Sequence, residues 1–418
     1  MLNVVMHKSQ IGNSELISEV NSRLVLQAVR VMQPTFRAAV ARRTGLKPAT
    51  VTVIINDLLK QQMLQEVNGS APASGFGRPP LMLEVNADVK RILAVDFEPD
   101  RLRVALTNLS LQELAYREQL IDRFAEPEEI LRLMLKLCRE VLGKTAREKL
   151  LGVGLSLPGM IDLERGVLIS STNMPNWRDV PIRDFLQQRL KIPVHVERSV
   201  RLAALYEDWI SPHLDEQTTL IISLRTGVGF SLINRGQLYV GNCGFDGEVG
   251  HTVVDIDGRV CECGSRGCLE TFVSATAICD RAKRELGSAR GAALRRRIDA
   301  GEPLTPELVY KLAREADPLC IDIVRDIGRY LGIATSNLIN LLAPTEVVIC
   351  GAIDMADELI LDAVREQVNR SALPRSREKT IIRLAREKEK LPLLGAGVLV
   401  AQQVFALPRL SHNSAAVS

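Results

Sequence analysis

Aromatic residues and long apolar runs are scarce in this sequence. Phe, Tyr and Trp make up 4% of the 418 residues, and only two residues are Trp. No stretch approaches the roughly 20 consecutive apolar residues of a membrane-spanning helix. The first ten residues, MLNVVMHKSQ, lack the apolar segment of a signal peptide. We therefore expect a cytoplasmic protein that has no membrane partner.

Net charge is also low, at +3, but it is unevenly distributed. Residues 1–85 contain nine Lys or Arg and five Asp or Glu, whereas the remainder is slightly acidic. A small basic region suits a phosphate-backbone partner, although such an excess also fits an ordinary solvated surface. The hydrophobic fraction of 46% and the charged fraction of 25% argue against wholesale disorder and fibrous folds. The length suits two or three domains.

The order of apolar patterns predicts an N-terminal winged helix-turn-helix followed by a two-lobed α/β body. Residues 15–33 have helical spacing, Gly45 ends a short second helix, and Pro48 begins a third. Two short strands then flank a Gly/Ser/Pro-rich loop. From Arg91 an order of three strands, helix, strand and helix occurs and begins again near residue 218.

These patterns predict four segments. Residues 1–85 form the DNA-binding domain, and residues 91–205 form the first lobe, closed by a C-terminal helix at 395–408. Residues 206–390 form the second lobe, and residues 411–418 form a disordered tail.

The second helix of the helix-turn-helix is the predicted recognition helix. Its outward residues suit base edges in a major groove, because Asn can pair with adenine while Thr and Ala can contact a thymine methyl. The predicted DNA contacts are Lys47, Ala49, Thr50, Thr52 and Asn56, with Arg78 of the wing at the minor groove or a phosphate. The alternative is a helical hairpin that serves dimerisation.

A second cluster predicts a metal site. Cys261, Cys263 and Cys268 lie within eight residues, and His251 lies upstream. Three thiolates and one imidazole make a closed tetrahedral ligand set for one structural Zn²⁺ ion per chain. Gly264 and Gly267 would let the chain wrap around the ion. The alternative is a group of free thiols.

With these motifs, the chain resembles the repressor branch of the ROK family of repressors, open reading frames and sugar kinases. The resemblance also includes Leu157-Pro-Gly159, Asn173-Met-Pro-Asn-Trp177, Thr226-Gly-Val-Gly229 and Glu248-Val-Gly-His251. It implies an actin-like ATPase (sugar-kinase-like) fold, with zinc on the four residues above and a sugar between the lobes. The implied effector contacts are Gly159, Asn173, Glu248, His251 and Glu270. Alternatively, Glu248 and Glu270 only support the zinc loop.

Two departures from the family pattern predict that the protein is not an enzyme. A family kinase has a phosphate turn of the type Asp-x-Gly-Gly-Thr, whereas this chain has Asp96-Phe-Glu-Pro-Asp100. Side chains therefore replace the glycines that would let backbone amides approach a phosphate. The Asn-Asp pair that supplies the family's catalytic base is Arg198-Ser199 here, and a lone serine cannot remove a sugar proton.

Arg198 leaves two readings of the effector site open. It could bind a negatively charged sugar derivative with two parallel hydrogen bonds. It could instead pair with Glu197 or Glu207 outside the pocket.

The sequence thus predicts a sugar-controlled repressor of carbohydrate genes. It would bind a double-stranded DNA operator as a homodimer or higher homo-oligomer. The alternatives are a sugar kinase with an added DNA-binding head and a ligand-independent DNA-binding protein.

Overall fold

The computed structural model describes residues 14–68, 81–171, 173–211, 217–225, 227–241, 246–351, 357–387 and 390–406. Arg78 of the predicted wing, Thr226 and the predicted tail at 411–418 lie outside the described residues. Among the helices in these ranges, none is both long and apolar enough to span a bilayer.

Three helices and a two-stranded antiparallel sheet form the N-terminal head. The order is α1 (Ser14–Met32), α2 (Arg37–Thr44), α3 (Pro48–Lys60), β1 (Leu64–Val67) and β2 (Met82–Val85). Gly45 ends α2 with a φ of 72° and donates its N–H to the Ala41 carbonyl over 2.9 Å. The inner face of α3 buries Val51, Ile55 and Leu58. The predicted helix–glycine–helix and wing strands are therefore present.

The first lobe is built on a five-stranded sheet with the order β10-β6-β3-β4-β5. The strands are β3 (Arg91–Glu98), β4 (Arg101–Asn108), β5 (Glu113–Leu120), β6 (Leu150–Leu157) and β10 (Val194–Arg198). The first three form an antiparallel meander, and β6 and β10 continue the sheet in parallel on the other side of β3.

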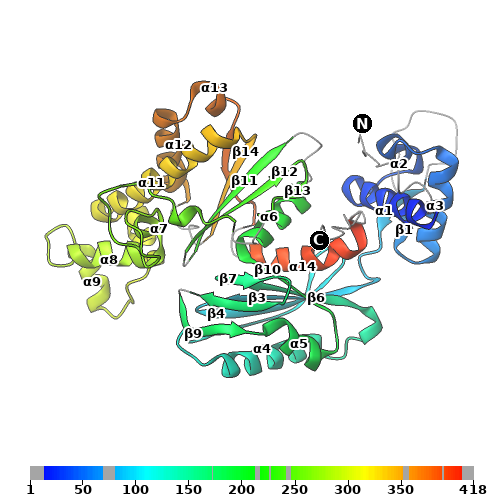
Figure 1. Cartoon of the computed structure of the whole chain (residues 1–418), viewed down its shortest axis with the longest axis horizontal. Helices are drawn as coiled ribbons and strands as arrows, with labels where there is room; N and C mark the ends of the chain where they lie inside the picture. Colours follow the sequence, from blue (N-terminus) through cyan, green and yellow to red (C-terminus); the bar gives the residue numbers. More distant parts are fainter. Residues whose placement is uncertain are drawn as a thin grey trace, which may run out of the picture.

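The sheet of the second lobe repeats this order as β13-β12-β11-β14-β15. Its strands are β11 (Thr218–Leu224), β12 (Val228–Asn234), β13 (Gln237–Leu238), β14 (Glu346–Gly351) and β15 (Ile381–Leu384). Again three antiparallel strands are followed by two parallel ones. The duplicated topology confirms the prediction of two similar lobes, which lie one above the other in Figure 1.

Helices and a smaller sheet complete the first lobe. The helices are α4 (Pro127–Leu142), η2 (Arg147–Lys149) and α5 (Ile182–Leu190), and the small sheet contains β7 (Met160–Asp162), β8 (Val167–Ser171) and β9 (Met174–Val180). The sequence analysis did not predict this sheet, because its strands are short and irregularly paired. It buries Trp177, whose ring lies 4.6 Å from that of Phe97.

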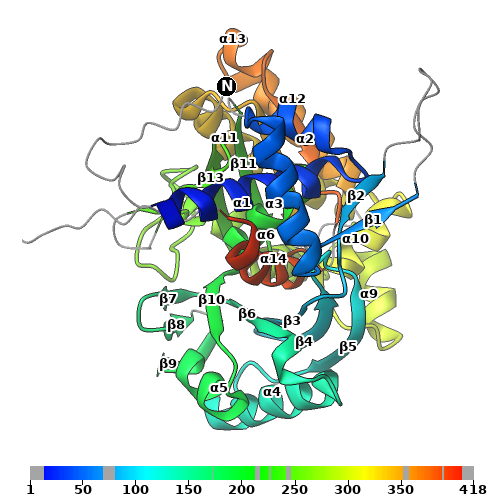
Figure 2. The same ribbon diagram turned by 90° about the vertical axis from the view of Figure 1, so that its right-hand side faces the viewer.

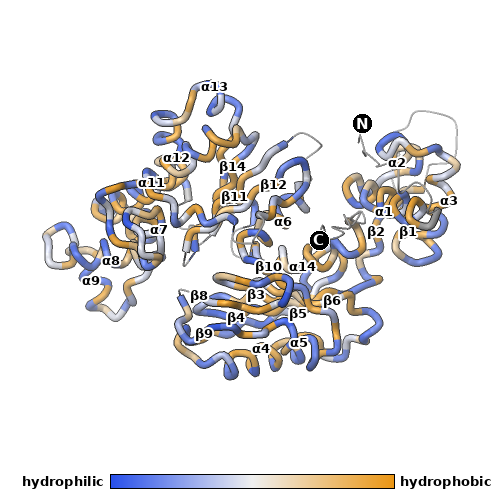
Figure 3. The backbone as a smooth tube through the Cα atoms, viewed as in Figure 1, coloured by the Kyte–Doolittle hydropathy of each residue, from blue (hydrophilic) through white to orange (hydrophobic). Residues whose placement is uncertain are grey.

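In the described residues, the second lobe carries more helices than the first. They are α7 (Glu270–Val273), α8 (Ala275–Glu285), α9 (Ala292–Asp299), α10 (Pro306–Arg314), α11 (Pro318–Leu342), α12 (Asp357–Ser371) and α13 (Pro374–Arg377). A short break separates α10 from α11. Ala316 has a φ of 65°, and the Asp317 carboxylate accepts the Cys320 N–H over 2.9 Å, so a new helix begins there. Figure 3 shows apolar residues concentrated in β11 and β14.

Helices α6 (Ser199–Ile210) and α14 (Leu391–Phe405) lie between the two sheets (Figures 1 and 2). They approach closely, since a Cβ on Gly395 would lie 2.0 Å from the Leu202 carbonyl oxygen. The C-terminal helix predicted at 395–408 instead begins at Leu391, where Pro392 suits the first turn, and ends at Phe405.

The head is joined to these central helices by α1. The Arg30 guanidinium lies 3.8 Å above the Trp209 ring, and its Nη1 donates to the Trp209 carbonyl over 3.0 Å. Arg23 Nη1 donates to the Ala406 carbonyl over 2.7 Å. A continuous apolar core also connects α1 with α6 and α14.

Candidate functional site

The predicted DNA-binding residues lie on the free face of α3 and at its start. Lys47, Ala49, Thr52 and Asn56 are exposed, and Thr50 is half-buried. Proline at the first position of α3 and the helical period together separate this face from the buried one.

Two of these side chains already have partners within the head. The Thr52 hydroxyl donates to the Pro48 carbonyl over 2.9 Å, as serine and threonine often do in helices. Asn56 Oδ1 accepts from Arg37 Nη2 over 3.4 Å, and Arg37 also pairs with Glu66 at 3.1 Å. The sequence analysis did not select Arg37, although its position at the start of α2 and its charge were visible signals.

The four predicted zinc ligands come together. Their ligand atoms all lie within 4.8 Å of one another. Cys261 Sγ is 3.6 Å from His251 Nδ1, and Cys263 Sγ is 3.7 Å from Cys268 Sγ. A tetrahedral ion with Zn–S bonds of about 2.3 Å and a Zn–N bond of about 2.0 Å requires edges of roughly 3.8 and 3.5 Å. The donor set and its spacing therefore fit Zn²⁺.

Local backbone geometry explains the cysteine spacing. His251 ends the one-turn 3₁₀ helix η3 (Val249–His251), and Cys268 pairs with Val253 through an isolated bridge. Gly267 has a φ of 72°, and a Cβ there would lie 1.5 Å from the Asp255 carbonyl oxygen. Glycine is required here because the two chain segments approach too closely for any side chain.

Arg198 contacts the second lobe. Its guanidinium donates to the carbonyl of Asp246 and forms an ion pair with Glu248. The predicted partners are engaged elsewhere, since the Glu197 carboxylate pairs with Arg201 at 3.3 Å. Arg198 thus faces a predicted effector residue, but that residue already supplies its counter-charge.

Glu207, the second carboxylate predicted as a possible partner of Arg198, also pairs with another residue. It is almost fully buried and pairs with Arg383 at 3.0 Å. Sequence analysis missed Arg201, which has 1% side-chain exposure and also pairs with Asp246. Its position three residues after Arg198, in the first turn of α6, was the available signal.

Glu270 lies beside the start of β12, and Glu248 and His251 lie close in the chain to Gly250, which packs against Val228 and Glu270. Glu270 Oε2 accepts the Val228 N–H over 3.0 Å, and a Cβ on Gly250 would lie 3.2 Å from the same oxygen. His251 presents Nδ1 to the cysteine cluster, which leaves Nε2 available. This arrangement can offer carboxylate and imidazole acceptors to hydroxyl groups while it supports the metal loop.

Gly159 and Asn173 have a different setting. Gly159 has a φ of 84°, and a Cβ there would lie 2.4 Å from the Ser170 carbonyl, which explains the glycine by packing. Asn173 lines an interlobe pocket of about 380 Å³ together with residues of the β3–β4 turn, the segment after β5 and the start of α8. None of the other predicted effector residues lines this pocket.

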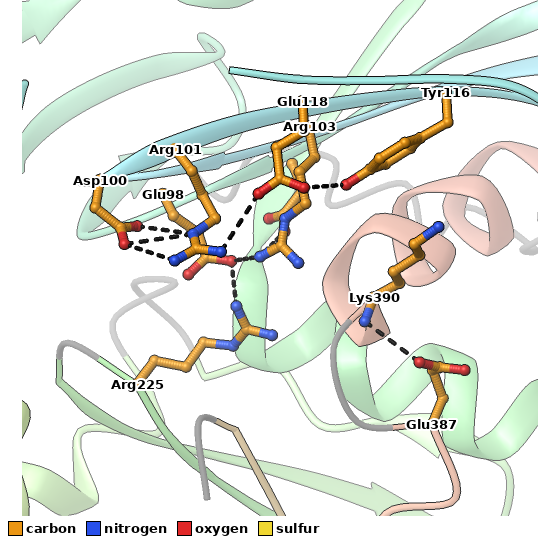
Figure 4. Close-up of polar contacts among 10 residues, drawn as sticks. Glu98, Asp100, Arg101, Arg103, Tyr116, Glu118, Arg225, Glu387 and Lys390 are labelled. Atoms are coloured by element: carbon orange, nitrogen blue, oxygen red, sulfur yellow. Dashed lines mark hydrogen bonds and ion pairs between the residues drawn. The ribbon is translucent and has the colours of Figure 1, made fainter. Parts of the chain in front are cut away.

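Charged side chains meet at the end of β3, where the sequence has Asp96-Phe-Glu-Pro-Asp100 in place of a Gly-rich phosphate turn (Figure 4). Glu98, at the end of β3, forms ion pairs with Arg103 of β4 and with Arg225, which follows β11 in the second lobe. Asp96 is fully buried, and its Oδ2 lies 3.3 Å from Arg103 Nη2. Burial, reinforced by the Glu98 carboxylate, raises the pKa of Asp96 to about 6.

The electrostatics of Glu98 differ from those of Asp96. Burial alone would raise its pKa, but the nearby Arg225 and Arg103 outweigh that effect and lower it. Glu98 is therefore held as a carboxylate. Glu98 thus supplies a negative charge to both arginines.

The winged-helix head, the duplicated lobes and the His/Cys cluster define the class of protein: an actin-like, sugar-kinase-type body that carries a DNA-binding-type head. The pattern of the ROK family matches residues 92–403, so the chain belongs to the ROK family.

Individual relatives include both regulators and kinases. The xylose repressor of Caldicellulosiruptor bescii is 28% identical over 402 residues, covering 95% of this chain and 99% of the relative. The crystal structure of a ROK family transcriptional regulator, homolog of the E. coli MLC protein, matches with a TM-score of 0.75, 25% identity and coverage of 93% and 97%. The ROK glucokinase of Streptomyces griseus, in complex with glucose and AMPPNP, matches with a TM-score of 0.67, 25% identity and coverage of 75% and 99%.

Proposed function

We propose that this protein is a DNA-binding transcriptional repressor of carbohydrate-metabolism genes and that a sugar controls its affinity for the operator. The observation that carries the proposal is the combination of an exposed recognition-type helix with a kinase-type body whose phosphate turn is filled by Glu98. Similarity to a xylose repressor over nearly the whole chain supports it. The protein would act in the cytoplasm, where its operator lies.

DNA recognition is tested on a duplex selected from a random library by the wild-type protein. Thr50→Ala and Asn56→Ala should each weaken binding to the selected duplex by on the order of 1–3 kcal/mol and change binding to random duplex little. Arg78→Ala should weaken binding to both duplexes and reduce the salt dependence. Ser18→Ala, on the exposed surface of α1, is the matched control. Unchanged affinity after removal of residues 1–85 would refute the assignment.

We further propose that the protein works as a homodimer or higher homo-oligomer. Two heads are needed to contact two operator half-sites at once. Light scattering coupled to gel filtration should give at least twice the 46.2 kDa chain mass. A monomer that binds the selected duplex with full affinity would contradict this.

We also propose that one structural Zn²⁺ is bound by His251, Cys261, Cys263 and Cys268. All four positions of a tetrahedron are filled by protein, so bound zinc would cross-link the loop and provide no site for catalytic water. Protein purified without added metal should contain about one zinc per chain, and Cys263→Ser should lose it together with stability. Cys279→Ser, outside the cluster, is the control.

We propose a neutral sugar as the effector, read by Glu248, His251 and Glu270, with Gly159 and Asn173 at the edge of the cleft. The Arg198–Glu248 pair supports this choice, because an anionic ligand would have to displace Glu248 from the guanidinium. Thermal-shift titrations should show stabilisation by D-xylose or D-glucose and less by glucose 6-phosphate or glucuronate. Preference for the anionic compounds, lost in Arg198→Ala, would favour the anionic-ligand alternative.

The protein should not phosphorylate sugars. Ser199 stands where the family's kinases have a carboxylate base, and Glu98 occupies the phosphate position. Incubation with ATP, Mg²⁺ and a panel of hexoses and pentoses should yield no sugar phosphate above background, with an active sugar kinase as the positive control. Turnover abolished by a cleft mutation would overturn this proposal.

A further inference from the structure

Glu98 and Arg225 connect the two lobes although they are 127 positions apart in the chain. The Glu98 side chain is only 14% exposed to solvent, and the Arg225 side chain only 15%. In Figure 4, Arg225 approaches Glu98 from the second lobe, while Arg103 approaches it from the neighbouring strand of the first. The carboxylate is therefore shared by arginines of both lobes.

We propose that Glu98 is a built-in anion that latches the two lobes together at the position where a nucleotide phosphate would otherwise lie. Its carboxylate takes the role that a bound phosphate would play between two cationic groups. The latch needs no ligand, since the anion belongs to the chain. It is separate from the proposed DNA site.

Charge balance around Glu98 supports a latch. Two carboxylates, Asp96 and Glu98, face two guanidinium groups, Arg103 and Arg225. The lowered pKa of Glu98 keeps that partner ionised at neutral pH. Separation of the lobes would take Arg225 away from the Glu98 carboxylate in a largely buried setting, so the pair opposes that separation.

The latch also shares a turn with the candidate effector residues. Arg225 begins the turn between β11 and β12, and Val228 at its other end donates to Glu270. A contact that moves Glu270 would reach Arg225 within this short segment. This link gives the latch a route to respond to the cleft.

The test measures lobe separation without any ligand or DNA, so its outcome does not depend on the proposed function. Arg225→Gln should increase the radius of gyration measured by small-angle X-ray scattering. It should also raise amide exchange about tenfold at the β3–β4 turn, in the opposite lobe. Glu98→Gln should have the same effect at the β11–β12 turn.

Matched variants separate a latch from local support. Arg101 and Glu118 form an ion pair at 3.3 Å within the first lobe, beside the latch, so Glu118→Gln should change neither measurement. The double variant Glu98→Gln/Arg225→Gln removes both charges of the interlobe pair. It should therefore fold even if a single variant does not, because neither charge of the pair remains buried without the other. It should open to the same extent as the single variants, because they disrupt one interaction. An unchanged radius with exchange confined to the mutated lobe would overturn the proposal.

Discussion

Asp96 illustrates how one residue can preserve a family position while its surroundings change. It lies within the buried part of β3, where a family kinase would begin its phosphate turn, and has no exposed surface. Its charged neighbours here are the Arg103 and Glu98 side chains. The folded protein therefore holds a proton on Asp96 more tightly than the unfolded chain does.

Asp96→Asn should change the pH dependence of stability. Because the folded pKa is raised from 3.8 to about 6, the stabilisation linked to this proton is complete below about pH 4 and is lost as the pH rises through 6. Between pH 5 and 7.5 the wild type should lose on the order of 1 kcal/mol that the asparagine variant keeps. Urea unfolding at both pH values measures the difference.

Asp184→Asn provides the control for that measurement. Its carboxylate is 53% exposed and pairs with Arg183 at the surface, so the difference from wild type should be the same at both pH values. A difference for Asp96→Asn that does not vary with pH would show that the buried carboxylate is not responsible.

At the scale of one element, the zinc loop depends on glycine at two positions for different reasons. Gly264 and Gly267 have φ values of 90° and 72°. A Cβ on Gly267 would collide with the Asp255 carbonyl, whereas a Cβ on Gly264 would meet no atom within 4 Å. Alanine at Gly264 would therefore test backbone strain alone, whereas alanine at Gly267 would test strain together with close packing.

Gly267→Ala should abolish metal binding, because the chain must move to admit the methyl group and Cys268 is the next residue. Gly264→Ala should retain about one zinc per chain and lose roughly 1 kcal/mol of stability from strain alone. Elemental analysis and zinc release to a chelating dye measure both variants. Equal zinc retention in the two would contradict the packing argument.

At the scale of the whole molecule, α6 connects the cleft with the head. Arg198, directly before the helix, contacts Glu248 of the second lobe, and Trp209 near its end stacks beneath Arg30 of α1. Burial lowers the pKa of Arg30 to about 10, and Asp208 partly offsets this. Eleven residues at about 1.5 Å each separate the two contacts by about 16 Å.

Arg30→Ala should loosen the head from the body. Loss of the desolvated cation–π contact and the hydrogen bond should cost about 2 kcal/mol at this joint. Hydrogen exchange should rise in α1 to α3 and stay unchanged in β11 and β14.

Arg42→Ala is the matched control for the joint, because Arg42 lies over Phe36, 5.6 Å from its ring, entirely within the head. It should leave exchange in α1 at the wild-type level. An identical exchange pattern in both variants would argue against a joint at Arg30.

The sequence by itself determined the features that depend on short spacings. The buried face of α3, the end of α2 at Gly45 and the convergence of the His/Cys ligands all follow from helical period, backbone freedom and short loops. The Asp96–Arg103 pairing was also accessible in principle, since a two-residue turn puts these residues opposite each other across β3 and β4.

Only the tertiary structure decided which distant charges meet. Arg198 faces Glu248 and not Glu197 or Glu207, and Glu98 meets Arg225 from the other lobe. No local period encodes such contacts, because they depend on how two independently formed sheets are placed around α6 and α14. A buried charge takes the partner that this placement brings within reach, since burial makes an unpaired charge far more costly than one at the surface.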